Sequence, residues 1–246
     1  MRNLTDPLAR DALTLNRSDK ALLYARLGQV WSKHDPKLAR TWFVRAVETV
    51  EAPPLSKTEE VCQRTSARTL LSFVADGDKA LTDQLIAIVE REQDDTDRLE
   101  NAHALATAGL SIANSNPKAA RVLAEKSLML GFSYRVALLL WRIKESDANE
   151  ADKLFQHILA LAKARADYYM YRMLSTAILN GPFSSSDKHR SLLVRSLADV
   201  IAQKEQGGSS EALFCDPEPL LPPLLADVDR FMPEFSHEYA TKSTTL

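Results

Sequence analysis

The sequence predicts an all-α fold, and three observations lead to that prediction. Apolar residues recur at intervals of three and four along almost the whole chain of 246 residues, which is the helical period. No β-branched alternating run occurs, and no such runs flank the Asn180-Gly181-Pro182 turn, so it does not signal a β-hairpin. Turn-forming groups such as Asn16-Arg17-Ser18 and His34-Asp35-Pro36 divide the chain into segments of about 12–20 residues, a normal helix length.

Capping signals place the start of several helices. Ser56 and Asp147 are each followed three residues later by Glu, the spacing of a capping box. Pro36 and Pro117 follow Asp and Asn, which places each proline at the first position of a helix. No Gly or Pro marks the expected break at residues 165–167. In order, the expected helices cover residues 5–15, 19–33, 36–50, 57–75, 77–91, 96–114, 117–130, 134–145, 148–164, 167–180, 187–205 and, shorter, 223–231.

Four turns repeat one pattern, in which an acidic or amide cap is followed four residues later by alanine. A helix precedes each turn and another follows it. A small side chain one turn into the second helix lets the paired helix approach closely, so we expect all four alanines to be buried. The four pairs are Asp35 and Ala39, Asp76 and Ala80, Asn116 and Ala120, and Asp147 and Ala151.

The first hairpin carries the residues of a known repeat. Tyr24-x-x-Leu27-Gly28-x-x-Trp31, followed by Ala39-x-x-x-Phe43 and Ala46, resembles the tetratricopeptide signature. The aromatic positions are exchanged relative to that family, and the turn is one residue shorter. Weaker copies extend the resemblance over roughly residues 20–165. In the hairpin around Ala80, the equivalents of the first-helix positions are polar: Thr65, Arg68, Thr69 and Ser72.

The resemblance implies a right-handed α-solenoid of about five antiparallel helical hairpins over residues 1–206, with a concave face that holds a peptide or partner protein. The expected function is therefore protein or peptide binding, with no catalysis and no cofactor. Two alternatives stay open: an enzyme whose site is assembled from distant helices of an all-α toroid or bundle, and a helical domain within a larger assembly. Carried over residue by residue, the family pattern places these side chains in the partner-binding groove: Gln29, Lys33, His103, Asn114, Tyr134, Trp141 and Lys144.

Local motifs predict neither catalytic residues nor a metal site. The five histidines are dispersed, and none has a zinc-ligand spacing. Asp94-Asp95-Thr96-Asp97 is similar to the Asp-rich magnesium motifs of helical enzymes, but Arg98 stands where the next carboxylate is needed. We expect this run to cap a helix instead. Cys62 is expected to be a buried or half-buried thiol, and two of the three tyrosines in Tyr168-Tyr169-Met170-Tyr171 are expected to pack between hairpins.

Charge and hydropathy narrow the set of partners. A formal charge of −2 argues against a nucleic-acid partner or an anionic membrane. The longest apolar run, residues 136–141, is far shorter than the roughly 18 residues of a membrane span. The start of the chain has no signal-peptide core, so a cytoplasmic location is expected. Residues 207–246 form an acidic, Pro-rich segment that we expect to be partly helical and to dock back on the repeats.

Overall fold

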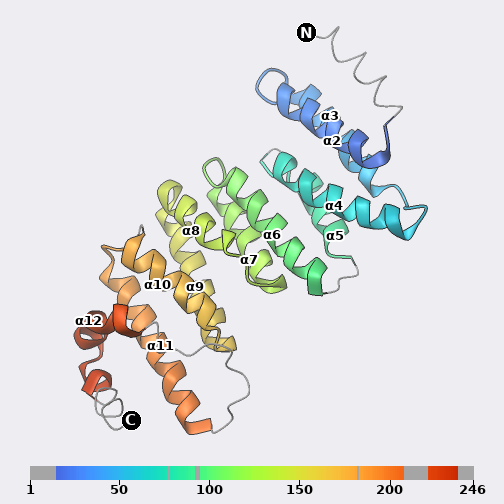
Figure 1. Cartoon of the computed structure of the whole chain (residues 1–246). Helices are drawn as coiled ribbons and strands as arrows, with labels where there is room; N and C mark the ends of the chain where they lie inside the picture. Colours follow the sequence, from blue (N-terminus) through green and yellow to red (C-terminus); the bar gives the residue numbers. More distant parts are fainter. Residues whose placement is uncertain (1–14, 77, 92–94, 182, 208–220, 238–246) are drawn as a thin grey trace. The chain divides into compact units, whose positions relative to one another are not determined.

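A computed structural model describes residues 15–76, 78–91, 95–181, 183–207 and 221–237 (Figure 1). All regular secondary structure in these ranges is helical, which confirms the all-α prediction, and every helix end lies within two residues of the expected position. Residues 5–14 of the expected first helix lie outside the described ranges. The helices are α2 (Arg17–Trp31), α3 (Pro36–Glu51), α4 (Lys57–Val74), α5 (Lys79–Val89), α6 (Asp95–Ile112), α7 (Pro117–Leu130), α8 (Arg135–Ser146), α9 (Ala148–Arg165), α10 (Tyr168–Asn180), α11 (Asp187–Gly207) and α12 (Leu221–Phe231).

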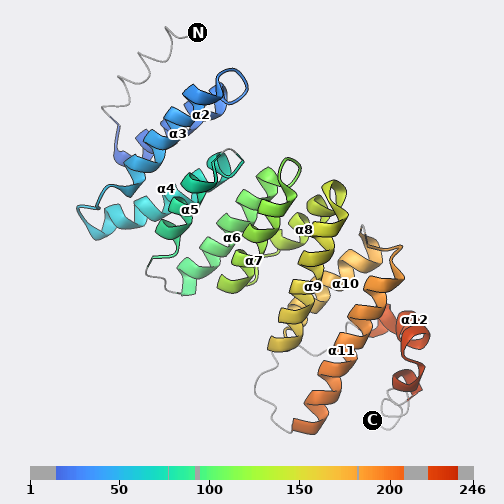
Figure 2. The ribbon, with the colours of Figure 1, turned by 180° about the vertical axis from the view of Figure 1, so that it is seen from behind.

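The chain divides into two compact units, residues 1–139 (unit 1) and 140–246 (unit 2). In unit 1, consecutive helices pair as α2 with α3, α4 with α5, and α6 with α7. Helix α4 also contacts both α2 and α6, so it lies between the two neighbouring hairpins (Figures 1 and 2). In unit 2, α10 and α11 each contact α9, and α11 also contacts α10 and α12.

Three of the four repeated alanines are buried, and the fourth is exposed. Ala39, Ala120 and Ala151 are buried, as expected for small residues at close helix contacts. The Ala120 carbonyl oxygen would lie only 3.3 Å from a Cβ added to Gly109, which shows how closely α6 and α7 approach. Ala80 is exposed, so the expectation for this fourth alanine is wrong.

The position of the N-cap of α5 explains why the prediction for Ala80 is wrong. Asp78, not Asp76, is the N-cap, and its carboxylate accepts hydrogen bonds from the backbone N–H groups of Ala80 and Leu81. The residue four positions after the true cap is Thr82, which is buried. The turn contains two acidic residues that could cap α5, Asp76 and Asp78. The sequence pattern used the first of them and therefore placed the buried residue at Ala80, two positions before Thr82.

The same shift applies to α4. Its buried residues are Ala67, Leu70, Leu71 and Val74, together with the polar Gln63 and Ser66. The four apolar residues have the same mutual spacing as Tyr24, Leu27, Gly28 and Trp31 in α2. The polar set expected at these positions, Thr65, Arg68, Thr69 and Ser72, is therefore two residues out of register, and none of the four is buried.

In unit 2, α12 covers part of α11. Leu221, Leu224 and Val228 of α12 are buried. Nη1 of Arg190, on α11, donates to both carboxylate oxygens of Asp227, at 2.9 and 3.0 Å. The described part of the acidic C-terminal segment therefore has a charged contact as well as an apolar one on the last long helix.

Of two further local predictions, one is confirmed and one is wrong. Tyr168 and Tyr171 are buried and Tyr169 is exposed, which confirms that two of the three tyrosines pack inside. Cys62 is exposed, so the expected buried or half-buried thiol is wrong. Within the described residues, none of the helices combines the length and the apolar character that crossing a membrane requires.

Candidate partner-binding face

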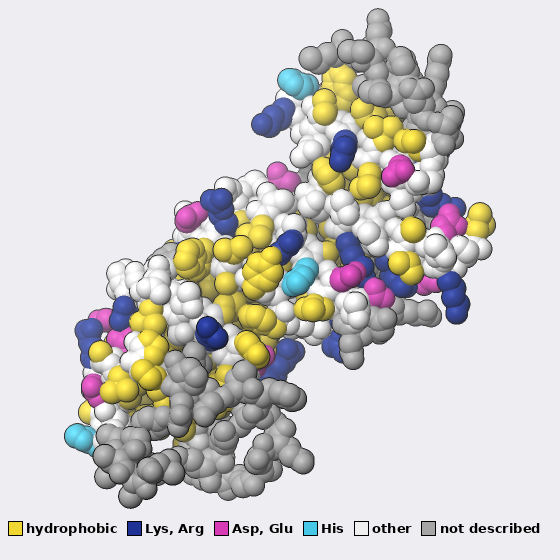
Figure 3. All heavy atoms as spheres, in the orientation of Figure 1, with side chains coloured by type: hydrophobic (Ala, Val, Ile, Leu, Met, Phe, Trp, Pro, Cys, Tyr) yellow, Lys and Arg dark blue, Asp and Glu magenta, His cyan; other side chains and the backbone are white. Residues whose placement is uncertain are grey.

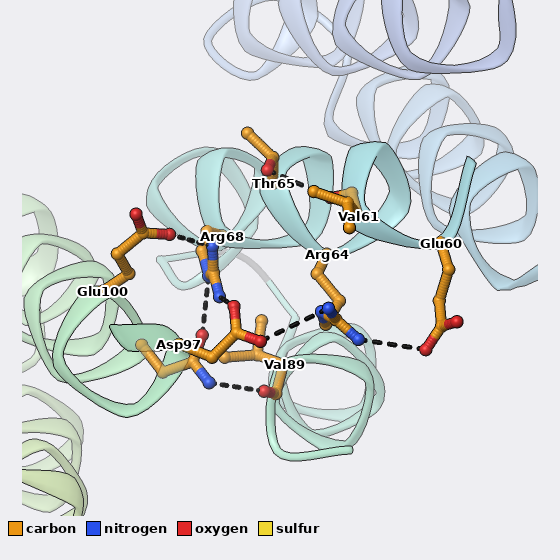
Figure 4. A network of polar contacts seen from close by, with 9 residues as sticks. Glu60, Val61, Arg64, Thr65, Arg68, Val89, Asp97 and Glu100 are labelled. Carbon is orange, nitrogen blue, oxygen red and sulfur yellow. Dashed lines mark hydrogen bonds and ion pairs between the residues drawn. The ribbon is translucent and has the colours of Figure 1, made fainter. Parts of the chain in front are cut away.

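A network of charged side chains joins α4 to α6 in unit 1 (Figure 4). Arg68 of α4 pairs with Asp97 and Glu100 of α6, and its Nε donates to Asn101 Oδ1 at 2.6 Å. Arg64, one turn earlier, pairs with Asp97 at 3.3 Å. The Arg68 side chain is only 11% exposed, so its three partners offset the loss of hydration. These arginines hold two hairpins together and are not free to bind a ligand.

Beside this network, exposed apolar and aromatic side chains form a row across α6 and the start of α8. Tyr134 is 59% exposed, Leu138 is 49% exposed and Leu99 is 46% exposed. The ring of half-buried His103 meets the Tyr134 ring edge to face, with centroids 5.8 Å apart. Leu99 precedes His103 by four residues and Leu138 follows Tyr134 by four, so each lies one helical turn from a ring. We call Leu99, His103, Tyr134 and Leu138 the apolar row.

Polar groups flank the apolar row. Arg135 donates to the Thr107 hydroxyl, which in turn donates to the His103 carbonyl at 2.7 Å. The Arg135 guanidinium also lies 5.9 Å from the Tyr134 ring centroid, within range of a cation–π contact. Figure 3 shows acidic, basic and histidine side chains over α4 and α6 next to a group of hydrophobic side chains. The arrangement offers apolar contact surface with hydrogen-bonding groups at its edge.

Of the seven side chains expected in the groove, the structure brings His103 and Tyr134 together. Gln29 is exposed near the end of α2, Lys33 is exposed in the following turn, and Asn114 is exposed in the turn after α6. The remaining two, Trp141 and Lys144, belong to unit 2. Lys144 pairs there with Asp152 at 3.2 Å, and a Cβ added to Gly181 would lie 2.9 Å from the Trp141 ring.

Leu99 and Leu138 were missed by the sequence reasoning. Both are apolar residues outside the buried set of their helix, one turn from an aromatic or histidine residue. An apolar residue that breaks the core-facing period of an otherwise amphipathic helix is the signal that identifies such positions. Arg68 and Asp97 could not be found in this way, because they are 29 residues apart and meet only through tertiary packing.

In unit 2, Ser186, His189 and Asp152 form a serine–histidine–aspartate cluster. Ser186 Oγ lies 2.5 Å from His189 Nδ1, and His189 Nε2 lies 3.2 Å from Asp152 Oδ1. The serine hydroxyl also faces the His189 backbone N–H at 3.5 Å, at the start of α11. The imidazole is 3% exposed and packs edge-on against the rings of Phe155 and Phe183. A hydroxyl at a helix start and an imidazole enclosed by two phenyl rings serve folding, so we assign this cluster to helix capping and packing.

Burial lowers the pKa of His189 below its ordinary value of 6.5, and nearby Lys144 and Lys188 lower it further. The Asp152 carboxylate opposes them but does not reverse the direction. The ring is therefore neutral near neutral pH. A neutral imidazole can accept a hydrogen bond from the Ser186 hydroxyl at Nδ1 and carry its own proton on Nε2, which faces Asp152.

Neither a search for metal-binding residues nor a comparison with known proteins assigns a further functional site. Within the described residues, no group of three or more His, Cys, Asp or Glu side chains could hold a metal ion. Asp97, the last member of the acidic run, instead pairs with the two arginines of α4. Comparison with known proteins gave no match to a protein-family model, to a curated protein or to a solved structure.

Proposed function

We propose that this chain is a tetratricopeptide-like helical-repeat protein that binds a protein or peptide partner and carries no catalytic site of its own. The apolar row of unit 1 is the observation that supports the proposal. Three large side chains of this row are about half exposed, next to hydrogen-bonding groups. Exposed apolar side chains gathered in one place are typical of interaction sites.

The recurring hairpin pattern supports a repeat architecture. A capping side chain followed four residues later by a buried residue occurs at Asp35, Asp78, Asn116 and Asp147. With the corrected register, four helices share this feature, and another helix precedes each cap. A repeat of this kind presents equivalent faces of successive first helices, and α6 and α8, which bear the apolar row, are such helices.

The partner would bury Tyr134 and Leu138 and use the histidine and threonine of α6 as hydrogen-bonding groups. Aromatic side chains that lose exposure at the centre of an interface often dominate its affinity. The charged network of α4 would border this contact and fix the spacing of the helices, because its arginines are already paired.

A binding experiment with matched variants tests this proposal. Peptides are selected from a displayed random library on the full chain, and their affinity is measured by fluorescence anisotropy. Tyr134→Ala with Leu138→Gln should weaken binding by about ten-fold or more, as expected for loss of a central anchor. The control pair, Tyr169→Ala with Met129→Gln, removes side chains of similar exposure elsewhere and should change affinity by less than about two-fold.

Two outcomes would contradict the proposal. One is a selection that enriches no peptide over several rounds. The other is an equal loss of affinity in the test pair and the control pair, with both variants keeping the helical circular dichroism of the parent chain.

A further inference from the structure

A second surface of unit 1 is a groove between α5 and α7, with a volume of about 460 Å³. Its apolar lining includes Ile86 of α5 and Val122 and Leu123 of α7. Ile86 and Leu123 are almost fully buried and form the floor, whereas Val122 is 40% exposed at the edge. The groove is large enough for two or three apolar side chains of a partner.

The two walls of the groove differ in how their charges are satisfied. On the α5 side, Asp83 pairs with Lys79, and Asp78 pairs with Arg40 at 2.6 Å while capping its own helix. Burial acts to raise the pKa of Asp78, but the backbone N–H of Leu81 and the Arg40 side chain outweigh it and lower the pKa, so this carboxylate stays ionised. The acidic wall is thus occupied by contacts within the chain.

On the α7 side, lysines face the groove with weaker partners. None of the ion pairs among the described residues involves Lys118, which is exposed. Lys126 pairs with Glu90 at 3.5 Å, and both side chains are more than a third exposed. Lys118, Val122 and Lys126 follow one another at intervals of four, so they form one line along α7, with about 6 Å between successive residues.

We propose that the α5–α7 groove binds an acidic amphipathic helix of a partner protein. Leucine or similar side chains of the partner would enter the groove beside Val122, and carboxylates about eight residues apart would pair with Lys118 and Lys126. This surface is separate from the apolar row, so the proposal does not depend on the function proposed for that row.

The direction of the partner helix follows from the helix dipoles. The N-caps of α5 and α7, Asp78 and Asn116, lie near the same end of the groove, where Ser115 donates to the Asp76 carboxylate. The positive dipole ends of both helices therefore lie there. A partner helix running antiparallel to them would place its negative C-terminal end and a carboxylate at Lys118.

The probe for this proposal is a labelled helical peptide of 15 residues, with Glu at positions 4 and 12 and Leu at positions 5, 8 and 9. Binding to the full chain is followed by fluorescence anisotropy in dilute and in concentrated salt. Lys118→Glu with Lys126→Glu should weaken binding by about ten-fold, because two attractions become repulsions. A second peptide, with Lys in place of both Glu residues, should bind this variant more tightly than it binds the parent chain.

The matched control is Lys33→Glu with Lys37→Glu, which reverses the same number of charges at two exposed lysines of unit 1 that do not line the groove. It should change affinity by less than about two-fold at the same salt concentration. The proposal is overturned if the probe does not bind, if the control variant loses as much affinity, or if the charge-exchanged peptide fails to restore binding. Val122→Glu should also abolish binding without lowering the helix content.

Discussion

Helices α3 and α5 of unit 1 end in a different way from helix α9 of unit 2, and the difference shows which contacts are local. At the end of α3 and of α5, a backbone carbonyl accepts a hydrogen bond from an amide side chain of the next hairpin. Asn101 of α6 is fully buried and donates from Nδ2 to the Val89 carbonyl at the end of α5, at 2.7 Å. Gln63 of α4 does the same for the Val50 carbonyl at the end of α3.

In unit 2, α9 ends through its own backbone. Ala166 has a φ of 50°, in the left-handed region, and its N–H bonds to the carbonyls of Ala162 and Lys163. The next N–H, of Asp167, also bonds to the Ala162 carbonyl, at 3.0 Å. This closing turn needs no residue from another hairpin. The unit 1 ends are therefore coupled to hairpin packing, whereas the α9 end can be changed by itself.

The largest expected effect is at the buried amide of unit 1. Asn101→Leu removes the hydrogen bond to the Val89 carbonyl and the bond from Arg68 Nε, leaving two polar groups without these partners. We expect the free energy of unfolding to fall by about 2–4 kcal/mol, measured by urea unfolding. Asn149→Leu, at an exposed position of α9, is the control and should change the free energy of unfolding by less than about 0.5 kcal/mol. A loss of similar size in both variants would show that the amide does not couple helix end and packing.

Gln63→Leu sharpens the same point within unit 1. Its second acceptor, the Ala52 carbonyl, also receives a hydrogen bond from Arg17 at 2.9 Å and keeps it in the variant. We therefore expect a smaller loss than for Asn101→Leu, about 1–2 kcal/mol in the same urea assay. If Gln63→Leu is the more damaging change, shared acceptors do not protect the end of α3.

The corrected register of unit 1 predicts opposite results for two alanines. Ala120→Leu adds three carbon atoms at a contact with no free space and should lower stability by about 1–3 kcal/mol. Ala80→Leu, at an exposed position, should leave the melting temperature nearly unchanged. Equal melting temperatures for the two variants would contradict the register in which Thr82 is the packing residue of α5.

These cases show how much the sequence could predict. The ends of the helices follow from capping residues and prolines close to them in the sequence. The spacing of buried residues within a helix follows from the helical period of its apolar residues. The turn with Asp76 and Asp78 offers two caps two residues apart, and only packing against α4 selects the second. The pairing of Arg68 with Asp97, and of Asn101 with Val89, depends on which hairpins meet, so local patterns carry no signal for it.

The candidate site was predictable to a similar degree. The family resemblance named His103 and Tyr134, and the two rings do meet. It also named Lys144, which lies in the second unit and pairs with Asp152. Leu138, in contrast, is exposed on a helix whose other apolar residues are mostly buried. Its exposure is a property of the folded surface that spacing alone does not reveal.

The local helix end of unit 2 predicts a small gain. An L-residue in the left-handed region costs roughly 1–2 kcal/mol, and glycine removes this cost. Glycine also raises the conformational entropy of the unfolded chain, which offsets part of the gain. Ala166→Gly should therefore raise the free energy of unfolding by about 0.5–1 kcal/mol. Ala160→Gly, in the exposed interior of α9, is the matched control and should lower it by a similar amount. Destabilisation by both glycines would mean that the Ala166 turn is held by packing.

The smallest expected effect is a pH dependence confined to unit 2. Because burial lowers the pKa of His189, the folded chain keeps this ring neutral at a pH where the unfolded chain, with a pKa near 6.5, already binds a proton. The stability that the neutral ring contributes is fully present above pH 6.5 and is lost as the pH falls through the lower folded pKa. His189→Phe removes this proton uptake, so its free energy of unfolding should fall less between pH 7.5 and pH 5 than that of the parent chain. Comparing how steeply the free energy of unfolding changes with pH, rather than its absolute value, separates the proton effect from the loss of the Ser186 contact. Carboxylates that titrate in this range contribute equally in the parent chain and in His189→Phe. His34→Phe, at an exposed turn, keeps His189 and should therefore retain the parent slope at this ring. An identical slope in His189→Phe and the parent would show that the His189 ring is protonated alike in the folded and unfolded chains.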